Sequence, residues 1–288
     1  MPIIVMADRS PIYIFDVLVP VKGELGVSIK SMQRHRTWLG YTQLILVSDQ
    51  APSMMSLKHA MQRGWFGDIL DEPRPDIMLE ASPVGESQSH GFIESAVNTV
   101  QGMIRTMRGA LDTRLGSRLR ITCDIIPWLV KHGAHTVSLY HVGVDGITPH
   151  NWVRGRNFNP EVRECGERVL YLSPDTQHKQ LHGQGQSDLT LEYGVWLGII
   201  PESTEVLIGT TEGVLKASRI TRQTEEESRW GQTYIEAVRG TPWAPVPGST
   251  GIDITPRVSM LLELKAPPYC HPWETQDIQT RRTHTQSR

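Results

Sequence analysis

The chain has 288 residues, 39% of them apolar, and a formal net charge of −2. This length suffices for one large or two modest domains, and the near-neutral charge excludes a basic field over the whole surface that would attract nucleic acid. The sequence shows no signal-peptide pattern and no apolar stretch long enough to span a membrane, so no membrane partner is expected.

Cysteine usage indicates a reducing compartment. The three cysteines, Cys123, Cys165 and Cys270, are an odd number and lie far apart. This argues against a disulfide framework and against a zinc site. A nuclear or cytoplasmic location is therefore expected.

The first 142 residues alternate between strand-like and helix-like patterns. The pair of apolar runs at the start predicts a β-hairpin across the polar turn 8–11. The expected elements are, in order, strands over 2–6 and 12–19, a helix over 24–40, a strand over 43–48, a helix over 53–63, a short strand over 77–80, and helices over 87–115 and 125–141. We predict an α/β domain over 1–142.

Short strand-like runs between turns follow in the second part of the chain. They predict a small β-rich, barrel-like module over 143–240. The runs cover 168–172, 193–200, 205–208 and 214–220. The segment 173–187 is polar and predicts a mobile loop, although His178 and His182 in it are four residues apart and could bind metal. Residues 241–288 are rich in proline and are expected to be a disordered tail.

Two carboxylates stand where metal-dependent phosphodiester chemistry would need them. Asp49 follows the apolar strand 43–48, and Ser87, His90 and Glu94 recur on one face of the helix that starts near residue 87. A carboxylate at a strand end and another on a nearby helix can hold divalent metal ions between them. Taken singly, Asp49 could instead cap the next helix, and Glu94 could be a solvent-facing residue.

These residues carry a family resemblance. Val47-Ser48-Asp49-Gln50-Ala51-Pro52, followed by Ser87-Gln88-Ser89-His90-Gly91-Phe92-Ile93-Glu94, resembles the second and third motifs of the retroviral and LTR-retrotransposon integrase core. The resemblance implies an RNase H-like mixed sheet flanked by helices, and an Asp, Asp, Glu triad that catalyses DNA 3′-processing and strand transfer. Asp49 and Glu94 would be catalytic residues and ligands of Mg²⁺ or Mn²⁺. The implied partners are the DNA of element ends and target, with a second copy of the chain as a possible partner.

The first member of the triad has no counterpart. The strands over 2–6 and 12–19 resemble the second and third strands of the integrase core, so the chain is expected to be truncated at its N-terminus, without the first strand and its Asp. Asp8 and Asp16 are the alternatives for the missing ligand. Without the central strand, the strands 2–6 and 43–48 should either pair directly or leave an aggregating fragment. We therefore expect a catalytically incomplete polynucleotidyl transferase.

The helix after Glu94 offers candidate DNA contacts. His90, Asn98, Gln101, Arg105 and Arg108 are the candidates, and the window 94–120 contains five arginines against Glu94 and Asp112. This window either contacts the DNA backbone or is a solvated helix face. Trp128 and Trp196 are expected in the core. The alternative functions are a non-catalytic nucleic-acid or protein-binding module and a non-functional remnant.

Overall fold

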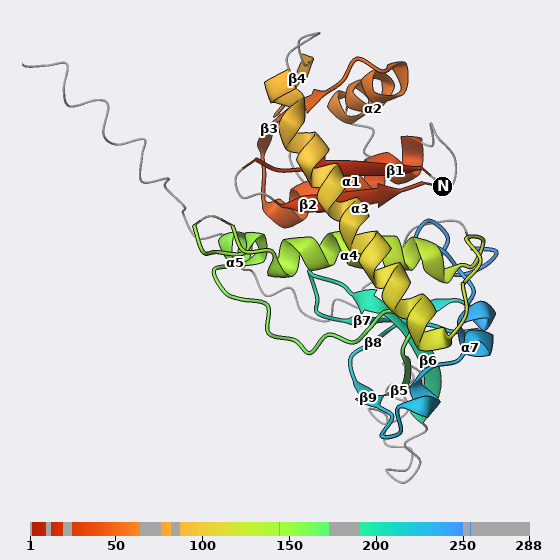
Figure 1. The fold of residues 1–288 in the computed structure, drawn as a ribbon. Coiled ribbons are helices and arrows are strands. Elements are labelled where there is room, and N and C mark those ends of the chain that lie inside the picture. Colours follow the sequence, from red (N-terminus) through yellow and green to blue (C-terminus); the bar gives the residue numbers. More distant parts are fainter. Residues whose placement is uncertain are drawn as a thin grey trace, which may run out of the picture. The chain divides into compact units, whose positions relative to one another are not determined.

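The computed structural model describes residues 2–9, 13–19, 25–63, 76–81, 87–143, 145–172, 191–249 and 254. All of them belong to one compact unit, Met1–Pro256. The predicted loop 173–187, with His178 and His182, lies outside the described residues, as do 250–253 and 255–288 of the predicted tail 241–288. Residues 241–249 of that tail are described, and Thr241 and Ala244 form a β-bridge there. The fold is mixed α/β (Figure 1). None of the helices in the described ranges is both long and apolar enough to cross a membrane.

The N-terminal elements form two small sheets and two helices. The elements are β1 (Ile3–Ala7), β2 (Ile14–Leu18), α1 (Leu25–Leu39), β3 (Gln43–Ser48), α2 (Pro52–Gln62) and β4 (Asp76–Ala81). Strands β1 and β2 form the predicted antiparallel hairpin. Strands β3 and β4 pair in parallel, with Ser48 opposite Ala81 at their C-terminal ends.

The side chains of β3 alternate as a strand packed on one face should. Leu44 and Leu46 turn toward an apolar cluster built from β1, β2, β4, α1 and α2. Ile45 and Val47 point to the other face, where they are 57% and 43% exposed. One face of the β3–β4 pair is therefore buried, and the other presents apolar side chains to solvent.

The two pairs of strands remain separate sheets. Among the described residues, β1 pairs only with β2, and β3 only with β4. The expected direct pairing of strands 2–6 and 43–48 is therefore wrong. The shared apolar cluster under α1 and α2, rather than a continuous hydrogen-bond ladder, joins the two pairs.

Two long helices follow. α3 (Ser87–Leu115) has 29 residues, and Gly116, at a φ of 62°, ends it in the left-handed conformation that favours glycine. α4 (Ile125–Tyr140) lies between the hairpin and the larger sheet (Figure 1). It is buried along almost its whole length because both neighbours cover it.

A serine of α4 completes the hydrogen bonding of the hairpin. The Ser138 hydroxyl accepts a hydrogen bond from the backbone N–H of Ile14 at 2.9 Å and donates one to the Ile14 carbonyl oxygen at 2.8 Å. Both groups lie in the interior, where an unpaired backbone group would be costly. The side chain therefore takes the place of a neighbouring strand at this point of β2.

The C-terminal part is an antiparallel sheet with short helices. The elements are α5 (Pro149–Arg154), β5 (Arg168–Leu172), β6 (Leu191–Ile199), β7 (Val206–Gly209), β8 (Val214–Ala217), β9 (Ile220–Arg222), the 3-10 turn η1 (Glu227–Arg229) and α7 (Gln232–Ala237). The strand order is β8-β7-β6-β5-β9, so the described strands form an open sheet and not a closed barrel. The single strand expected over 214–220 is two strands at opposite edges of this sheet.

The main apolar cluster combines residues from both sides of position 142. Trp128 of α4 and Trp196 of β6 are both fully buried in it, which confirms that they are core residues. The indole N–H of Trp128 donates a hydrogen bond of 2.8 Å to the Gly240 carbonyl oxygen. Packing thus connects α4 with the larger sheet.

Candidate functional site

Asp49 lies directly after β3 and is exposed. Its Oδ1 accepts a hydrogen bond of 3.3 Å from the backbone N–H of Ala51, and the Ser48 hydroxyl donates to the Asp49 carbonyl oxygen at 2.8 Å. An Asp side chain that bonds the backbone two residues later stabilises a turn. This turn leads into α2, whose first residue is Pro52.

Glu94 lies two turns into α3 and is also exposed. Because β3 and β4 are parallel, Asp49 follows β3 at the same edge at which β4 ends. The chain then enters α3 a few residues after β4, and Glu94 is roughly 10 Å along that helix from its start. The topology therefore places the turn of Asp49 and the entrance to the Glu94 helix at one edge of the β3–β4 pair.

The residue types that bind metal ions are dispersed in the described part of the chain. In the described part of the chain, no group of three or more His, Cys, Asp or Glu residues could hold a metal ion. Asp8 lies in the hairpin turn, where its carboxylate accepts a 2.5 Å hydrogen bond from the Tyr41 hydroxyl. Asp16 is buried in β2. Asp49 and Glu94 supply two carboxylates, and an Mg²⁺ or Mn²⁺ ion held by them would take its remaining oxygen ligands from water or a substrate phosphate.

A polar stripe continues the Glu94 face of α3. Asn98, Gln101 and Arg105 are all exposed, and the Arg105 guanidinium donates to Gln101 Oε1 at 3.1 Å. Arg108 differs, because its guanidinium is half-buried and donates to the Leu119 carbonyl oxygen at 3.1 Å. The side chain of His90 lies outside the described part of the structure. Asn98, Gln101 and Arg105 are therefore the accessible members of the predicted set.

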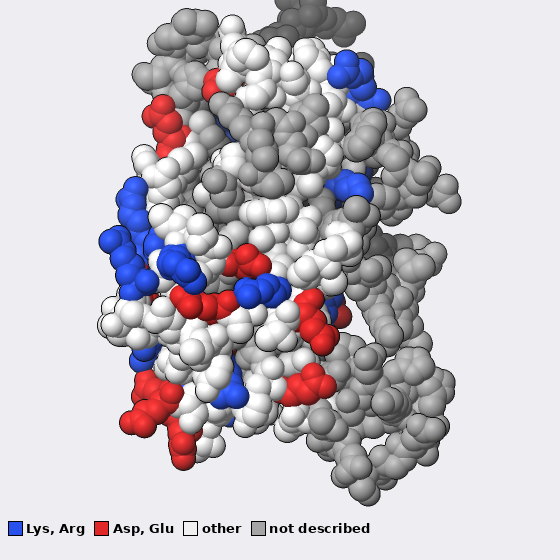
Figure 2. Space-filling model, turned by 90° about the vertical axis from the view of Figure 1, so that its right-hand side faces the viewer, with Lys and Arg blue, Asp and Glu red and all other residues white. Residues whose placement is uncertain are grey.

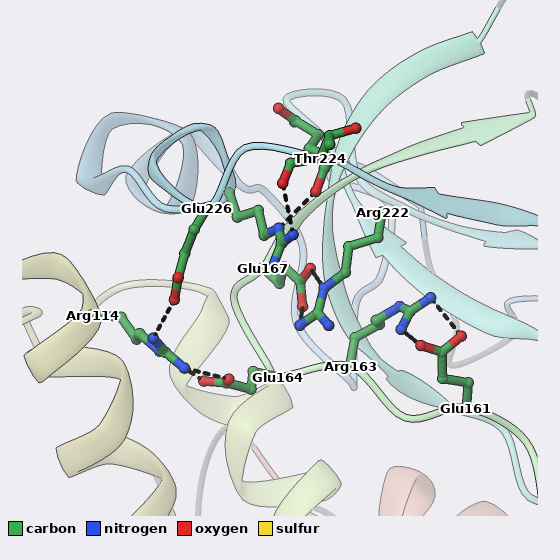
Figure 3. A network of polar contacts seen from close by, with 10 residues as sticks. Arg114, Glu161, Arg163, Glu164, Glu167, Arg222, Thr224 and Glu226 are labelled. Atoms are coloured by element: carbon green, nitrogen blue, oxygen red, sulfur yellow. Dashed lines mark hydrogen bonds and ion pairs between the residues drawn. The ribbon is translucent and has the colours of Figure 1, made fainter.

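Acidic residues from distant parts of the sequence pair with arginines at the end of α3 and just after it. Arg114 forms ion pairs of 2.8 Å with Glu164 and with Glu226 (Figure 3). Arg120 lies 3.6 Å from Glu236. Figure 2 shows acidic and basic surface side by side over the lower half of the face it presents. The positive charge counted in the sequence window is therefore largely neutralised in the fold.

The same region contains a buried ion pair. The carboxylate of Glu167 is fully buried and accepts two hydrogen bonds from the Arg222 guanidinium, at 2.5 and 2.9 Å (Figure 3). A bidentate arginine is the geometry that best compensates a buried carboxylate. These contacts fix the segment before β5 to β9, and Arg114 ties the end of α3 to that segment and to η1.

Sequence reasoning missed a cluster of buried ionisable groups around Asp16. Burial raises the pKa of this carboxyl from 3.8 to about 6, and the nearby Lys131 opposes the rise. Neither carboxylate oxygen has a hydrogen-bond partner among the described residues. Burial also lowers the pKa of His35 to about 3. The only sequence signal is a single charged residue inside the apolar run 12–19.

A second missed feature lies on the larger sheet. A cavity of about 650 Å³ adjoins β6, and its lining includes Arg168, Tyr193 and Tyr234. These residues come from β5, β6 and α7, so no local sequence pattern connects them.

Comparisons with known proteins leave the family open. No protein-family model matches the chain, and no curated protein matches it. Among solved structures, one chain of the simian T-cell lymphotropic virus intasome in complex with PP2A regulatory subunit B56 gamma is similar, with a TM-score of 0.34 and 11% identity. The similarity covers 78% of this chain and 77% of that chain. A TM-score of this size does not establish a shared fold.

Proposed function

We propose that this protein is integrase-like, derived from the RNase H-like core of an LTR retrotransposon, and that it binds DNA without catalysing strand transfer. The observation that carries the proposal is the order of elements around two motif carboxylates. Asp49 ends a strand that pairs in parallel with β4, and β4 leads into the long helix with Glu94. The antiparallel hairpin before these elements also agrees with the resemblance.

The DNA-binding face that we propose is the exposed stripe of α3. Asn98 and Gln101 supply amide groups that hydrogen-bond phosphate or base edges, and Arg105 supplies a guanidinium. With Arg114 and Arg120 ion-paired within the fold, few phosphates are neutralised at once. Binding is therefore weak and moderately salt-dependent.

The DNA-binding test is a salt titration of a labelled duplex by fluorescence anisotropy, with paired arginine variants. Arg105→Ala should flatten the slope of log K against log salt by about 0.9, since one phosphate contact is lost. Arg108→Ala should flatten it less, because its guanidinium is engaged with Leu119. Arg114→Ala is the matched control, because that side chain is ion-paired within the fold, and its slope should equal that of the unmodified protein. Equal slopes for all variants would remove α3 from the DNA interface.

Catalysis is tested separately with element-end oligonucleotides in Mn²⁺. Asp49 and Glu94 are what remains of the metal site in this proposal, and they bind Mg²⁺ or Mn²⁺ weakly at most. We expect neither 3′-processing nor strand transfer. Cleavage that disappears in Glu94→Gln would contradict this expectation and would show that another residue completes the ligand set.

One observation favours a protein-binding function as the second candidate. Ile45, Val47 and Met78 form an exposed apolar patch on the outer face of the β3–β4 pair. Apolar patches of this kind often mark protein interfaces, and a second copy of the chain is one partner that would cover it. Sedimentation analysis of the unmodified protein and of Ile45→Ser would detect such a homo-oligomer.

A further inference from the structure

Strand β6 has a stretch with a neighbour on one side only. Its pairing with β5 covers Leu191 to Val195, whereas its pairing with β7 starts at Val195, opposite Gly209, and continues to Ile199. Within the described ranges, residues 191–194 therefore have an open edge on the side of β7.

The backbone groups of Tyr193 point toward this open edge. The N–H of Trp196 donates to the Glu167 carbonyl oxygen at 2.8 Å, and the Gly166 N–H donates to the Trp196 carbonyl oxygen at 2.9 Å. The backbone of Trp196 therefore faces the β5 side. Because these groups alternate in direction along an antiparallel strand, the N–H and C=O of Tyr193 and of Leu191 face the other way. Such an edge is a template for another strand.

The cavity lies beside the same edge. Its lining includes Tyr193 and Gly194 of β6, Gly209 and Thr210 at the end of β7, and Tyr234 of α7. At about 650 Å³, it falls within the size range of ligand pockets in proteins. Because its walls combine the open edge of β6 with the turn after β7, an extended segment can continue the line of β7 there.

Arg168 gives the edge a chemical preference. Its guanidinium carbon lies 4.0 Å from the ring centroids of both Tyr193 and Tyr234, which are 55% and 40% exposed. The rings cover the guanidinium faces, and in the part of the chain that the structure describes the group forms no hydrogen bond or ion pair. Its in-plane N–H donors match a carboxylate.

The acidic residues nearby do not cancel this preference. Glu192 alternates with Tyr193 along β6, so its side chain leaves β6 on the opposite side from Tyr193. It still lines the cavity, where it accepts a 2.8 Å hydrogen bond from the Tyr171 hydroxyl. Glu212, in the turn after β7, also lines the cavity. Glu192 and Glu212 both disfavour a second carboxylate, so the site suits one acidic side chain, placed beside Arg168.

We propose that the open edge of β6 binds an extended peptide segment of a partner protein as an added antiparallel strand, with one acidic side chain of the peptide paired to Arg168. Main-chain hydrogen bonds to Tyr193 and Leu191 supply affinity, as in other proteins that bind peptides at a sheet edge. Arg168, held between two rings, supplies selectivity for the acidic side chain.

The test uses the full chain and four synthetic peptides of alternating threonine and valine. The peptides carry glutamate, glutamine or lysine at the centre, and the fourth is the glutamate peptide with the edge-facing amides N-methylated. Fluorescence anisotropy measures affinity, and amide chemical shifts locate the site. We expect chemical-shift changes at the amides of Leu191 and Tyr193. The glutamate peptide should bind about tenfold more tightly than the glutamine peptide, because it gains one charge-assisted contact. The N-methylated peptide should not bind.

Protein variants separate pairing from selectivity. Arg168→Gln should abolish the preference for glutamate while the glutamine peptide still binds. Arg156→Gln, at an exposed arginine outside the larger sheet, should keep the preference. The proposal fails if millimolar glutamate peptide causes no shift at Tyr193, if the lysine peptide binds as well, or if N-methylation has no effect. A thymidine oligonucleotide that shifts the same amide resonances and binds more tightly than the glutamate peptide would also overturn the proposal. That result would favour base stacking on the tyrosines.

Discussion

Replacement of the buried Asp16 by asparagine should stabilise the protein near neutral pH. The folded state raises the pKa of this carboxyl from 3.8 to about 6 because burial disfavours the charged form. The folded state therefore binds the proton more tightly than the unfolded state does. Ionisation costs stability, and this cost develops as the pH rises from 3.8 to about 6 and is complete above it.

The size of the effect follows from the pKa difference. A pKa that is higher by about two in the folded state lowers the free energy of unfolding by about 3 kcal/mol at pH 7.5. At pH 5 the reduction is about half of that. Asp16→Asn removes the charge at every pH, so it should recover up to these amounts. The pKa of about 6 already includes the attraction to Lys131, which opposes the rise, so its loss does not reduce these figures a second time.

Urea unfolding followed by tryptophan fluorescence measures this effect at pH 7.5 and pH 5. The probe is suitable because Trp128 and Trp196 are buried. Asp76→Asn, at an exposed position in β4, is the matched control and should change stability at neither pH. An equal change for Asp16→Asn at both pH values, or a loss of stability at pH 7.5, would refute the argument from burial.

The other stability predictions concern buried polar groups. Burial lowers the pKa of three histidines, so the folded state binds fewer protons than the unfolded state. The midpoint of urea unfolding should therefore fall as the pH drops below 6.5. A midpoint that does not change between pH 7.5 and pH 5.5 would contradict this. These histidines are His35, His132 and His135. Ser138→Ala should lower the free energy of unfolding in urea by about 2 kcal/mol or more, because two buried backbone groups of Ile14 lose their partner. Ser138→Thr keeps a hydroxyl and should lower the free energy of unfolding by less. Arg222→Gln should cost about 3 kcal/mol by leaving the Glu167 carboxylate buried and unpaired, whereas Arg114→Gln should change the midpoint little because that pair is exposed.

Local patterns predicted the elements that rest on periodicity and caps. The strand over 43–48 and the helix from Ser87 to Leu115 have the expected bounds, because an apolar run and a long apolar stripe are both visible within one segment. The helix α5 was not predicted, although its signals are present. Thr148 caps it with a 3.2 Å hydrogen bond to the Asn151 N–H, Pro149 occupies its first turn, and Gly155 ends it at a φ of 66°.

Contacts between distant segments could not be predicted from the sequence. The window 94–120 looked basic because its own acids are few, but Glu164, Glu226 and Glu236 come from later parts of the chain. The strand expected over 214–220 was divided because its two halves pair with different neighbours, β7 and β5. The candidate carboxylates Asp49 and Glu94 were found from motifs, whereas Arg168, Tyr193 and Tyr234 meet only in the fold.

The burial of α4 between two neighbours has a consequence for biosynthesis. The hairpin and α3, which cover one side of the helix, precede it in the chain, but β6 ends roughly 60 residues after it. At translation rates of about 5 to 20 residues per second, the side that carries Trp128 and Leu129 waits about 3 to 12 s for its cover. During that interval the nascent chain presents a long apolar helix face, which is the kind of surface that chaperones bind and that aggregates when they are scarce.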